Sequence, residues 1–537
     1  MFKKQSEHQL EVLKRNARSG KISRRKFMEG ALALGATIPA AASFWATNVT
    51  AATPKTGGQF RVGLDNGSTT DTLDPATFNS RFQIFMAHTR TNFLTEIGPD
   101  NQVTGELAES FEASKDAKTW TLKLRKGAEF HNGKTFDAND AAASLNYHRG
   151  EDSKSAAKAL LQSVVDIKVD DPQTLVIQLS SGNADIPYAL TDYHLIMLPA
   201  DKEGKIDPQE KAGTGGYVLE NFEPGVKANF KRFANYWKKD HAFFDEVVYT
   251  AINDTTARHN ALLGGELDAI IECDYQTVDM LQQNPELRID EVPSGTHVCL
   301  PMQVDVAPFD NPDVRLALKY AIDREATIAT VLNGHGSIGN DHPISPIMPF
   351  YDAGIEQRKH DPDKAKFHLK KAGLESLSVS LSAANTVIVG AIDMAVLYSE
   401  MAKKAGINID VVREPDDGYW SNVWLKKPFC MSGWGQRPTA DIIFTLGYAA
   451  GADWNESHFK DEKFNKLLIE ARAELDNAKR AEMYSQMQRI LNSDGGTIIP
   501  FFRNWIYARS AKVAHSGVLS GNWPLDGARG AERWWFA

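Results

Sequence analysis

Tryptophan and tyrosine side chains gather in the last quarter of this 537-residue chain, where their rings could stack on a small organic ligand. The residues are Tyr419, Trp420, Trp424, Trp434, Trp454, Trp505, Trp523, Trp534 and Trp535. Large, rigid and amphipathic rings suit a cleft that binds a small molecule. Any one of them can equally be a core or packing residue. The group therefore predicts a cleft but does not show which of these residues line it.

The segment 432–438, with the sequence SGWGQRP, is more specific than the rest of this aromatic group. Two glycines flank Trp434, and Pro438 follows Arg437. Glycine and proline at this spacing are typical of an exposed loop with a defined shape. The segment therefore predicts a ligand-binding loop.

Most sequence motifs of catalysis are missing from the chain. It has no G-x-S-x-G elbow, no H-E-x-x-H motif, no Walker loop and no G-x-G-x-x-G motif on a strand-to-helix turn. Residues 213–217 (GTGGY) lack a following Lys-Ser/Thr pair, so we interpret them as a tight turn. His131 lies on a turn and is expected to be structural. The sequence does not exclude a pair of carboxylates for glycoside hydrolysis, because the distance between two such groups depends on the fold.

Neither a metal site nor a cofactor is predicted. Cys273, Cys299 and Cys430 form no C-x-x-C pattern, and the histidines are scattered. Asp416 and Asp417 do not belong to a calcium-binding loop motif. We expect the three cysteines to be small core residues.

The N-terminal segment has the features of an export signal. Arg24 and Arg25 precede a short run rich in glycine and alanine, and residues 49–51 (VTA) resemble a cleavage site. The paired arginines indicate the twin-arginine route, with cleavage near Ala51 and Ala52 and a periplasmic location. An N-terminal membrane anchor is the alternative, although the run is shorter than the roughly 20 apolar residues that span a bilayer.

Length and charge narrow the class of protein further. The chain carries a net charge of −9, and loss of residues 1–52, with nine Lys/Arg against three Asp/Glu, would leave −15. An acidic surface argues against nucleic-acid binding, which needs clustered lysine and arginine. The length after residue 52 exceeds one hydrophobic core and predicts two or three domains.

Strand and helix patterns alternate along the chain. Apolar and polar residues alternate at 119–125, 174–179 and 229–233, which predicts strands. Asp137 is positioned to cap an alanine-rich helix, and residues 310–313 (DNPD) to start another. Apolar stripes at 464–475 and 483–491 predict two further helices. The mixture indicates an α/β or α+β protein with at least two lobes.

Several separated blocks resemble the large solute-binding proteins of ABC importers, the family of the dipeptide- and oligopeptide-binding proteins. The blocks occur in the family's order and cover almost all of the chain after residue 52. They are residues 107–111, 119–133, 136–140, 213–217, 232–237, 308–315 and 321–324.

This resemblance implies an α/β fold of the two-lobed periplasmic binding protein class, a Venus flytrap with an extra N-terminal subdomain. One lobe would comprise residues 53–300, with the subdomain at about 91–189, and the C-terminal return at 500–537. Residues 301–499 would form the second lobe. The implied function is a monomeric, non-enzymatic receptor that binds a peptide or small solute and passes it to the permease subunits.

The resemblance also implies site residues. Gly433 and Trp434 match the family's ligand loop, and Trp420 matches an upstream pocket tryptophan. Arg437 stands where the family has an aspartate for the peptide α-ammonium, and Asp441 comes four residues later. Because a guanidinium repels an ammonium and binds a carboxylate, we hypothesise a modified peptide, an amino-acid conjugate or another anionic solute. The alternative is that Arg437 pairs with a neighbouring carboxylate such as Asp441.

Two polar segments of the first lobe complete the predicted site. Asn79 and Arg81 follow one predicted element, and Tyr193 and His194 follow another. We expect these side chains to face the cleft. Two other functions stay open: an exported enzyme that uses the twin-arginine route, and a nickel- or haem-delivery receptor of the same family.

Overall fold

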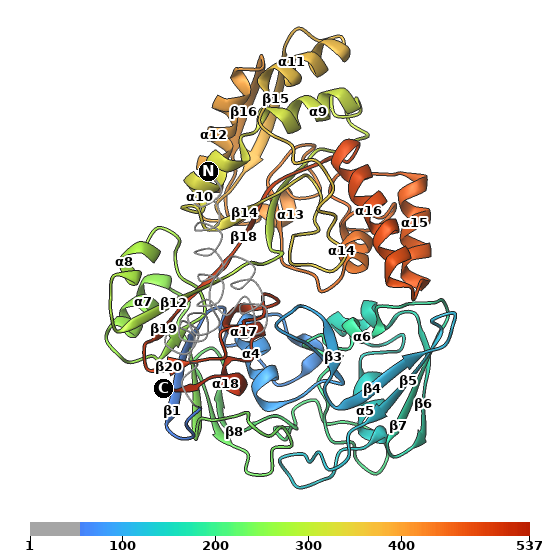
Figure 1. Ribbon diagram of the computed structural model, residues 1–537, viewed down its shortest axis with the longest axis vertical. Coiled ribbons are helices and arrows are strands. Elements are labelled where there is room, and N and C mark those ends of the chain that lie inside the picture. Colours follow the sequence, from blue (N-terminus) through green and yellow to red (C-terminus); the bar gives the residue numbers. More distant parts are fainter. Residues whose placement is uncertain (1–53) are drawn as a thin grey trace, which may run out of the picture.

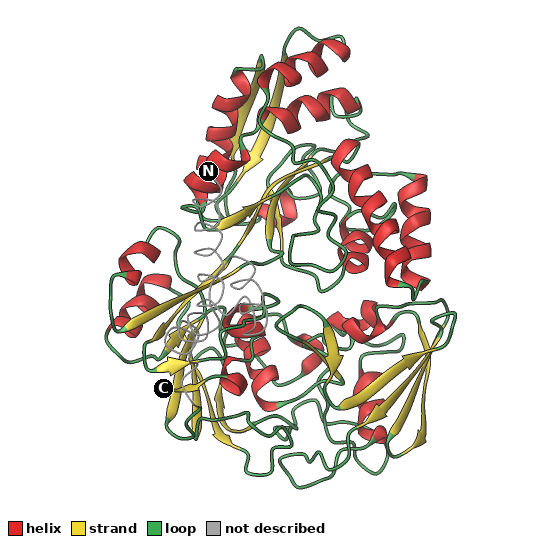
Figure 2. Cartoon of the chain, viewed as in Figure 1, coloured by secondary structure: helices red, strands yellow, loops and turns green. Residues whose placement is uncertain are grey.

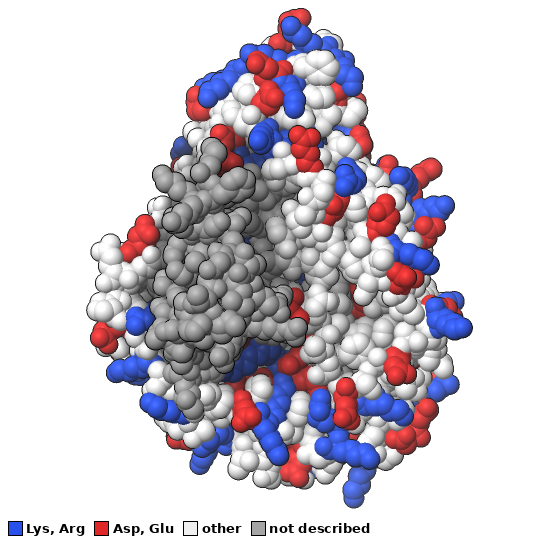
Figure 3. Space-filling model, in the orientation of Figure 1, with Lys and Arg blue, Asp and Glu red and all other residues white. Residues whose placement is uncertain are grey.

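The computed structural model describes residues 54–537, which form two lobes stacked along the longest axis of the molecule (Figure 1). The predicted export signal at residues 1–52 lies outside the described residues. Helices and strands are mixed in both lobes, which confirms the predicted α/β class (Figure 2). Within residues 54–537, no helix is long and apolar enough to span a bilayer. On the face shown in Figure 3, acidic and basic side chains are interspersed over both lobes.

The lower lobe is built on a seven-stranded mixed sheet with the order β12-β19-β11-β1-β10-β9-β8. β1 is parallel to both of its neighbours, β10 and β11. The strands are β1 (Gln59–Leu64), β8 (Tyr217–Glu223), β9 (Lys227–Arg232), β10 (Glu246–Ala251), β11 (Ala269–Ile270), β12 (Leu287–Val292) and β19 (Trp505–Ser510). The strand predicted at 229–233 is β9.

The helices of the lower lobe include one from the N-terminal part of the chain and two from the C-terminal tail. They are η1 (Pro75–Thr77), α4 (Arg81–Arg90), α7 (Thr255–Leu263), α8 (Val278–Gln282), α17 (Pro524–Gly527) and α18 (Gly530–Arg533), with the short strands β20 (Val513–Ala514) and β21 (Trp535–Phe536). One apolar core joins the sheet residues Phe60 and Tyr249 to Phe85 of α4 and Trp534 of the tail. The C-terminal tail therefore belongs to the lower lobe.

A four-stranded antiparallel sheet, β4-β5-β7-β6, forms a subdomain beside this lobe, at the lower right of Figure 1. Its elements are β4 (Ala108–Ala113), β5 (Thr119–Leu124), β6 (Val164–Asp171), β7 (Thr174–Leu179), α5 (Ala138–Tyr147), η2 (Ala156–Leu161) and α6 (Ile186–Ala189), with β2 (Thr95–Ile97) and β3 (Val103–Gly105) alongside. The strands predicted at 119–125 and 174–179 are the central pair of this sheet. Asp137 caps α5, as predicted, by accepting hydrogen bonds from two backbone N–H groups of its first turn.

The upper lobe contains a four-stranded sheet, β14-β18-β13-β17, and a parallel pair, β15-β16. Its strands are β13 (His297–Pro301), β14 (Gly336–Ile338), β15 (Leu377–Ala383), β16 (Ile407–Arg413), β17 (Ser432–Trp434) and β18 (Thr497–Arg503). Its helices are α9 (Pro312–Ala321), α10 (Arg324–Val331), α11 (Pro362–Lys371), α12 (Ala391–Lys403), α13 (Tyr419–Asn422), α14 (Ala440–Gly447), α15 (Glu462–Ala473) and α16 (Asn477–Ser493). The predicted helix starting near Pro312 is α9, capped by Asn311, and the two C-terminal stripes are α15 and α16.

The glycines of segment 213–217 allow a close approach between two parts of the lower lobe. A Cβ atom on Gly213 would lie 2.0 Å from the carbonyl oxygen of Arg90, at the end of α4, and one on Gly215 would lie 2.6 Å from its carbonyl carbon. The imidazole of His131 fixes the turn, because Nε2 bonds the Gly215 carbonyl and Nδ1 accepts from the Gly213 N–H. His131 is thus structural, as expected.

The chain crosses between the lobes at two places, which lie side by side. β12 belongs to the lower sheet and β13 to the upper one, so residues 293–296 make the first crossing. β18 and β19 make the second at Asn504. The Arg503 N–H donates to the Thr296 carbonyl at 2.9 Å, and Ser294 Oγ donates to the Arg503 carbonyl at 2.6 Å. Two hydrogen-bonded crossings of this kind form a hinge between the lobes.

Five histidines are held neutral inside the described part of the chain. Burial lowers the pKa of each imidazole, to about 3 for His88 and to about 4 for His131, His148, His297 and His342. In the unfolded chain a histidine titrates near 6.5. Between pH 6.5 and about 4, the unfolded state therefore binds protons that the folded state excludes, and the free energy of unfolding falls as the pH drops.

Replacement of His342, which is 1% exposed, tests this linkage. The wild-type free energy of unfolding should fall between pH 7.5 and pH 5.0 in urea titrations. His342→Leu should lose about 2 kcal/mol less over the same interval, because one proton-linked group has been removed. Ile344→Ala, a cavity variant nearby, should lower stability equally at both pH values. An identical loss for wild type and His342→Leu would contradict the linkage.

Candidate ligand-binding cleft

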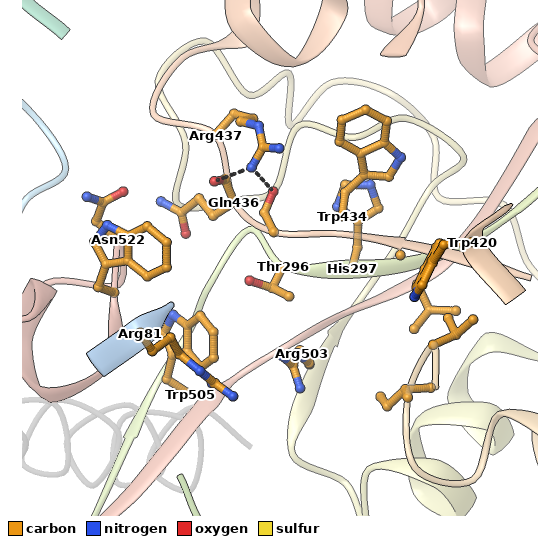
Figure 4. A pocket seen from close by; sticks show the side chains of 16 residues that line it. Arg81, Thr296, His297, Trp420, Trp434, Gln436, Arg437, Arg503, Trp505 and Asn522 are labelled. Carbon is orange, nitrogen blue, oxygen red and sulfur yellow. Dashed lines mark hydrogen bonds between the residues drawn. The ribbon is translucent and has the colours of Figure 1, made fainter. Parts of the chain in front are cut away.

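A cavity of about 260 Å³ lies between the lobes, where the two crossings meet the segment 432–438 (Figure 4). The exposed loop predicted here is only partly correct, because Ser432–Trp434 form strand β17, which pairs with β13 and buries Trp434. The upper lobe contributes Trp420, Trp434 and Arg437, and the hinge contributes Thr296 and Arg503. Helix α4 and the C-terminal tail close the lower side. The lining therefore combines residues that are far apart in sequence and belong to both lobes.

Trp420 and Trp434 line the upper wall of the cleft, and Trp424 and Trp454 connect them in a chain of packed indole rings. The ring centroids are 5.9 Å apart for Trp420 and Trp424, 6.1 Å for Trp424 and Trp454, and 5.9 Å for Trp454 and Trp434. Trp420 and Trp454 remain 42% and 43% exposed. Exposed rings that are supported by buried ones provide a rigid surface on which a ligand can stack.

A buried carboxylate fixes this wall from behind. Glu456 Oε1 accepts hydrogen bonds from Trp424 Nε1 and Ser432 Oγ, and Oε2 accepts from Trp434 Nε1 at 3.1 Å and Cys299 Sγ at 3.5 Å. Burial raises the pKa of Glu456, and the hydrogen bonds act in the opposite direction. All four donors are neutral, so the carboxylate orients the two indoles without an ion pair.

Two of the three arginines that line the cavity are neutralised by carboxylates. Arg81 pairs with Asp65 and, at 2.6 Å, with Glu272. Glu272 also forms an ion pair with Arg503 of the hinge, with 3.1 Å between Oε1 and Nη1. Burial opposes the charge on Glu272, but the guanidiniums of Arg503 and Arg81 outweigh it and lower its pKa. These four groups balance one another and leave no net charge for a ligand.

Arg437 differs from these two arginines, because it forms no ion pair within residues 54–537. Its Nη1 donates only long hydrogen bonds to carbonyls of its own loop, at 3.4 Å to Gly435 and 3.5 Å to Gln436. The guanidinium lies 5.6 Å from the ring centroid of Trp434. Burial lowers the pKa of Arg437, while Tyr193 and the carboxylate of Asp192 act in the opposite direction. The site thus contains one half-buried cation with donor capacity to spare.

Two further polar atoms of the lining have no partner among the described residues. They are Thr296 Oγ1 and His297 Nε2. His297 Nδ1 donates to the Gly295 carbonyl at 2.9 Å, which leaves Nε2 as an acceptor. Burial lowers the pKa of His297 to about 4, so the ring is neutral at pH 7. A ligand N–H or O–H group can donate to these atoms.

The structure brings most of the predicted site residues together. Trp420, Gly433, Trp434, Arg437 and Arg81 all line the cavity. Tyr193 and His194 line an adjoining cavity that also contains Arg437. Both ring nitrogens of His194 already have hydrogen-bond partners: Nδ1 bonds the Asp192 carboxylate, and Nε2 bonds the Phe78 carbonyl.

Two predicted residues lie outside both cavities. Asn79 is exposed, and its backbone N–H donates to Gln83. Asp441 is buried and accepts two hydrogen bonds from Arg472 Nε, at 3.0 and 3.2 Å. Asp441, the alternative partner considered for Arg437, is therefore paired with Arg472 instead.

Sequence analysis did not identify Thr296, His297, Arg503 or Glu456 as part of this region. The first three lie at the chain crossings, whose positions follow from strand pairing and carry no motif. Glu456 has only a neighbouring tryptophan as a local signal. The cysteines fit the expectation, since Cys273, Cys299 and Cys430 are buried and unpaired. Residues 54–537 contain no cluster of three or more His, Cys, Asp or Glu that could hold a metal ion.

Comparison with known proteins places this architecture in a family. The profile described as bacterial extracellular solute-binding proteins, family 5, matches residues 102–456. The glutathione-binding protein GsiB of Salmonella choleraesuis is 26% identical over 486 residues, which cover 85% of this chain and 90% of that protein.

Solved structures show the same fold. AgaA of Agrobacterium tumefaciens R10, in complex with agropinic acid, is 25% identical with a TM-score of 0.71, covering 89% of this chain and 99% of AgaA. DppA of Helicobacter pylori, in complex with the peptide STSA, is 22% identical with a TM-score of 0.70, covering 87% of this chain and 97% of DppA.

The role of Glu456 can be tested with Glu456→Gln. The amide NH₂ would face donors that now bond a carboxylate oxygen, so the free energy of unfolding should fall by about 1–3 kcal/mol. The near-ultraviolet circular dichroism of the tryptophans should weaken as well. Glu462→Gln, on the surface of α15, is the matched control and should leave both signals unchanged. Wild-type behaviour of Glu456→Gln would show that the carboxylate does not hold the indoles.

Proposed function

This chain belongs to the bacterial extracellular solute-binding proteins of family 5, and on that premise we propose that its cleft captures an anionic small solute. The chain is a substrate-binding receptor of an ABC importer, and its relatives are periplasmic binding proteins rather than enzymes. The finer proposal concerns the ligand: a modified peptide, an amino-acid conjugate or a similar organic anion, bound between the lobes and delivered to the permease.

One observation carries this proposal: Arg437 is the lining guanidinium without a carboxylate partner in the described chain, whereas Arg81 and Arg503 are paired. Arg437 is half-buried, and a charge partly shielded from water without a partner is unfavourable, whereas a guanidinium offers two parallel donors to a carboxylate. A carboxylate at Arg437 removes this cost. The free α-ammonium of a peptide at the same place would instead add a second cation.

The position of Arg437 also links the anion to closure of the lobes. Arg437 belongs to the upper lobe, and it lines the same cavity as Tyr193 of the lower lobe. Moving an open–closed equilibrium from 1:99 to 99:1 requires about 5.5 kcal/mol of differential affinity for the closed state. One charge-assisted hydrogen bond contributes about 1.5–3 kcal/mol, so stacking on Trp420 and hydrogen bonds to Thr296 must supply the remainder.

The ligands named for two relatives agree with an anion. GsiB is named for glutathione, and AgaA was solved with an organic acid, agropinic acid. The peptide complex of DppA shows that the fold also holds peptides. We therefore propose that the residue at position 437 determines whether the cleft binds a peptide or another anion.

Calorimetric titration with matched small ligands tests this assignment. An N-acetylated dipeptide presents a carboxylate and no ammonium, and a dipeptide amide presents the reverse. The wild-type protein should prefer the N-acetylated form. Arg437→Gln should weaken its binding about 10- to 100-fold, which corresponds to one charge-assisted hydrogen-bonded contact. Arg437→Asp should abolish binding of the anion and favour the amide.

Arg413→Gln, on the exposed end of β16, is the control for a general loss of positive charge and should bind as the wild type does. Arg437→Gln should not lower the melting temperature, since Arg437 makes no ion pair among residues 54–537. If Arg437→Gln and Arg437→Asp keep wild-type affinity for the N-acetylated dipeptide, the anion is not bound at Arg437.

We also propose that residues 1–52 direct export by the twin-arginine route, with cleavage near Ala51, and that the mature receptor is a monomer. The paired arginines before a short apolar run support this part of the proposal. Replacement of Arg24 and Arg25 by lysine should retain the full-length chain in the cytoplasm, as seen by cell fractionation and N-terminal sequencing. Efficient periplasmic recovery of that variant would contradict this route.

A further inference from the structure

A second cavity of about 620 Å³ adjoins the ligand cleft and extends between the subdomain and the upper lobe. The two cavities share Gln436, Arg437, Asn522 and Trp523 in their linings. Arg437 therefore stands at the junction, where its guanidinium is accessible from both spaces. A ligand held at Arg437 can extend from the tryptophan wall into this side chamber.

The walls of the side chamber are mainly apolar and come from both lobes. Ala156 and Ala159 of η2 lie on the subdomain side, and both are exposed to the chamber. Leu446 of α14 and Trp454 lie on the opposite side. In Figure 1, α6 of the subdomain lies below α14, α15 and α16 of the upper lobe. Apolar side chains that face each other across a cavity form a surface on which an apolar group can be buried.

Charged groups of the chamber are few and mostly engaged. Asp192 bonds the ring of His194 at 2.5 Å, and Asp453 is exposed at the rim. Arg437 is the remaining charge in the lining. The chamber thus offers one cationic end and an apolar interior, which complements an anion that carries an apolar substituent.

Contacts between the lobes lie next to α6, whose residues Tyr188 and Ala189 also line the chamber. Arg480 of α16 pairs with Asp185, the residue before α6, at 2.7 Å. The Ala184 N–H donates to the carbonyl of Arg472 at 2.7 Å. An apolar group in the chamber would therefore be enclosed by both lobes and would bind the closed arrangement more tightly than the open one.

From this geometry we infer that the side chamber binds an apolar substituent of the ligand whose anionic group sits at Arg437. The inference rests on the proposed function and narrows it to an amphipathic anion, such as an N-acylated amino acid. The dimensions allow this, since a cavity of roughly 150 Å³ already holds a benzene molecule. Each methylene group removed from water contributes a factor of about four in affinity.

Calorimetry with N-acetylglycine, N-hexanoylglycine and N-decanoylglycine, each below its aggregation concentration, tests the inference. All three carry the same carboxylate and differ only in acyl length. Affinity of the wild-type protein should rise with length, at least tenfold from the acetyl to the hexanoyl compound. Arg437→Gln should weaken all three by a similar factor.

Filling the chamber provides the matched comparison. Ala159→Phe, or independently Ala156→Phe, should remove most of the gain with acyl length and leave N-acetylglycine binding unchanged. Ala478→Phe, at an exposed alanine of α16 outside both cavities, should retain the gain. Affinity that is independent of acyl length, yet lost in Arg437→Gln, would overturn the side chamber and leave the proposed function standing. Failure of all three compounds to bind would overturn both.

Discussion

The half-buried guanidinium of Arg437 is the interaction around which the cleft is organised, and its cost is clearest beside the paired charges of the same molecule. Arg529 is buried and the Lys238 side chain is only 9% exposed, whereas Arg437 is half-buried. Glu106 and Glu532 meet Arg529 and Lys238 at 2.7–2.9 Å. Those four groups join the C-terminal tail to the body of the lower lobe as a closed network. Arg437 has no such network among residues 54–537. Because a charge partly shielded from water is unfavourable without a partner, an arriving anion completes an arrangement that the chain leaves incomplete.

The remaining parts of the cleft make that compensation selective. The indoles of Trp424 and Trp434 are held by one carboxylate, Glu456, so the wall beside Arg437 is set before a ligand arrives. Preorganisation of this kind reduces the entropy lost on binding. Thr296 lies in the hinge, and its backbone carbonyl bonds Arg503 of the second crossing. A ligand that reaches Thr296 therefore touches the segment about which the lobes move, which couples occupancy to closure.

Local signals in the sequence predict the helices and strands. Pairing between segments that are distant in sequence explains the site residues that were not predicted. Asp137 caps its helix through two N–H groups within three residues, so its sequence context suffices to predict it. The glycines that flank Trp434 predict an exposed loop, whereas pairing of β17 with the distant strand β13 holds this residue in a sheet and buries it. Glu456 becomes part of the site only because β13 and β17 pair and bring its donors together. Asp441 accepts a hydrogen bond from Arg472, 31 residues further along the chain. Local sequence spacing does not predict a contact of this kind.

The contacts that close the lobes are themselves only moderately stabilising, which suits a receptor that must open again. Opening about the crossings separates Arg480 from Asp185, a buried pair whose attraction is offset by the desolvation of both charges. One carboxylate oxygen of Asp185 has no hydrogen-bond partner in the described chain, so the compensation is incomplete. A closed state held only by this pair would be close to balance with the open one. The free energy that decides between them must then come from the ligand, through its anion at Arg437 and its contacts with both lobes.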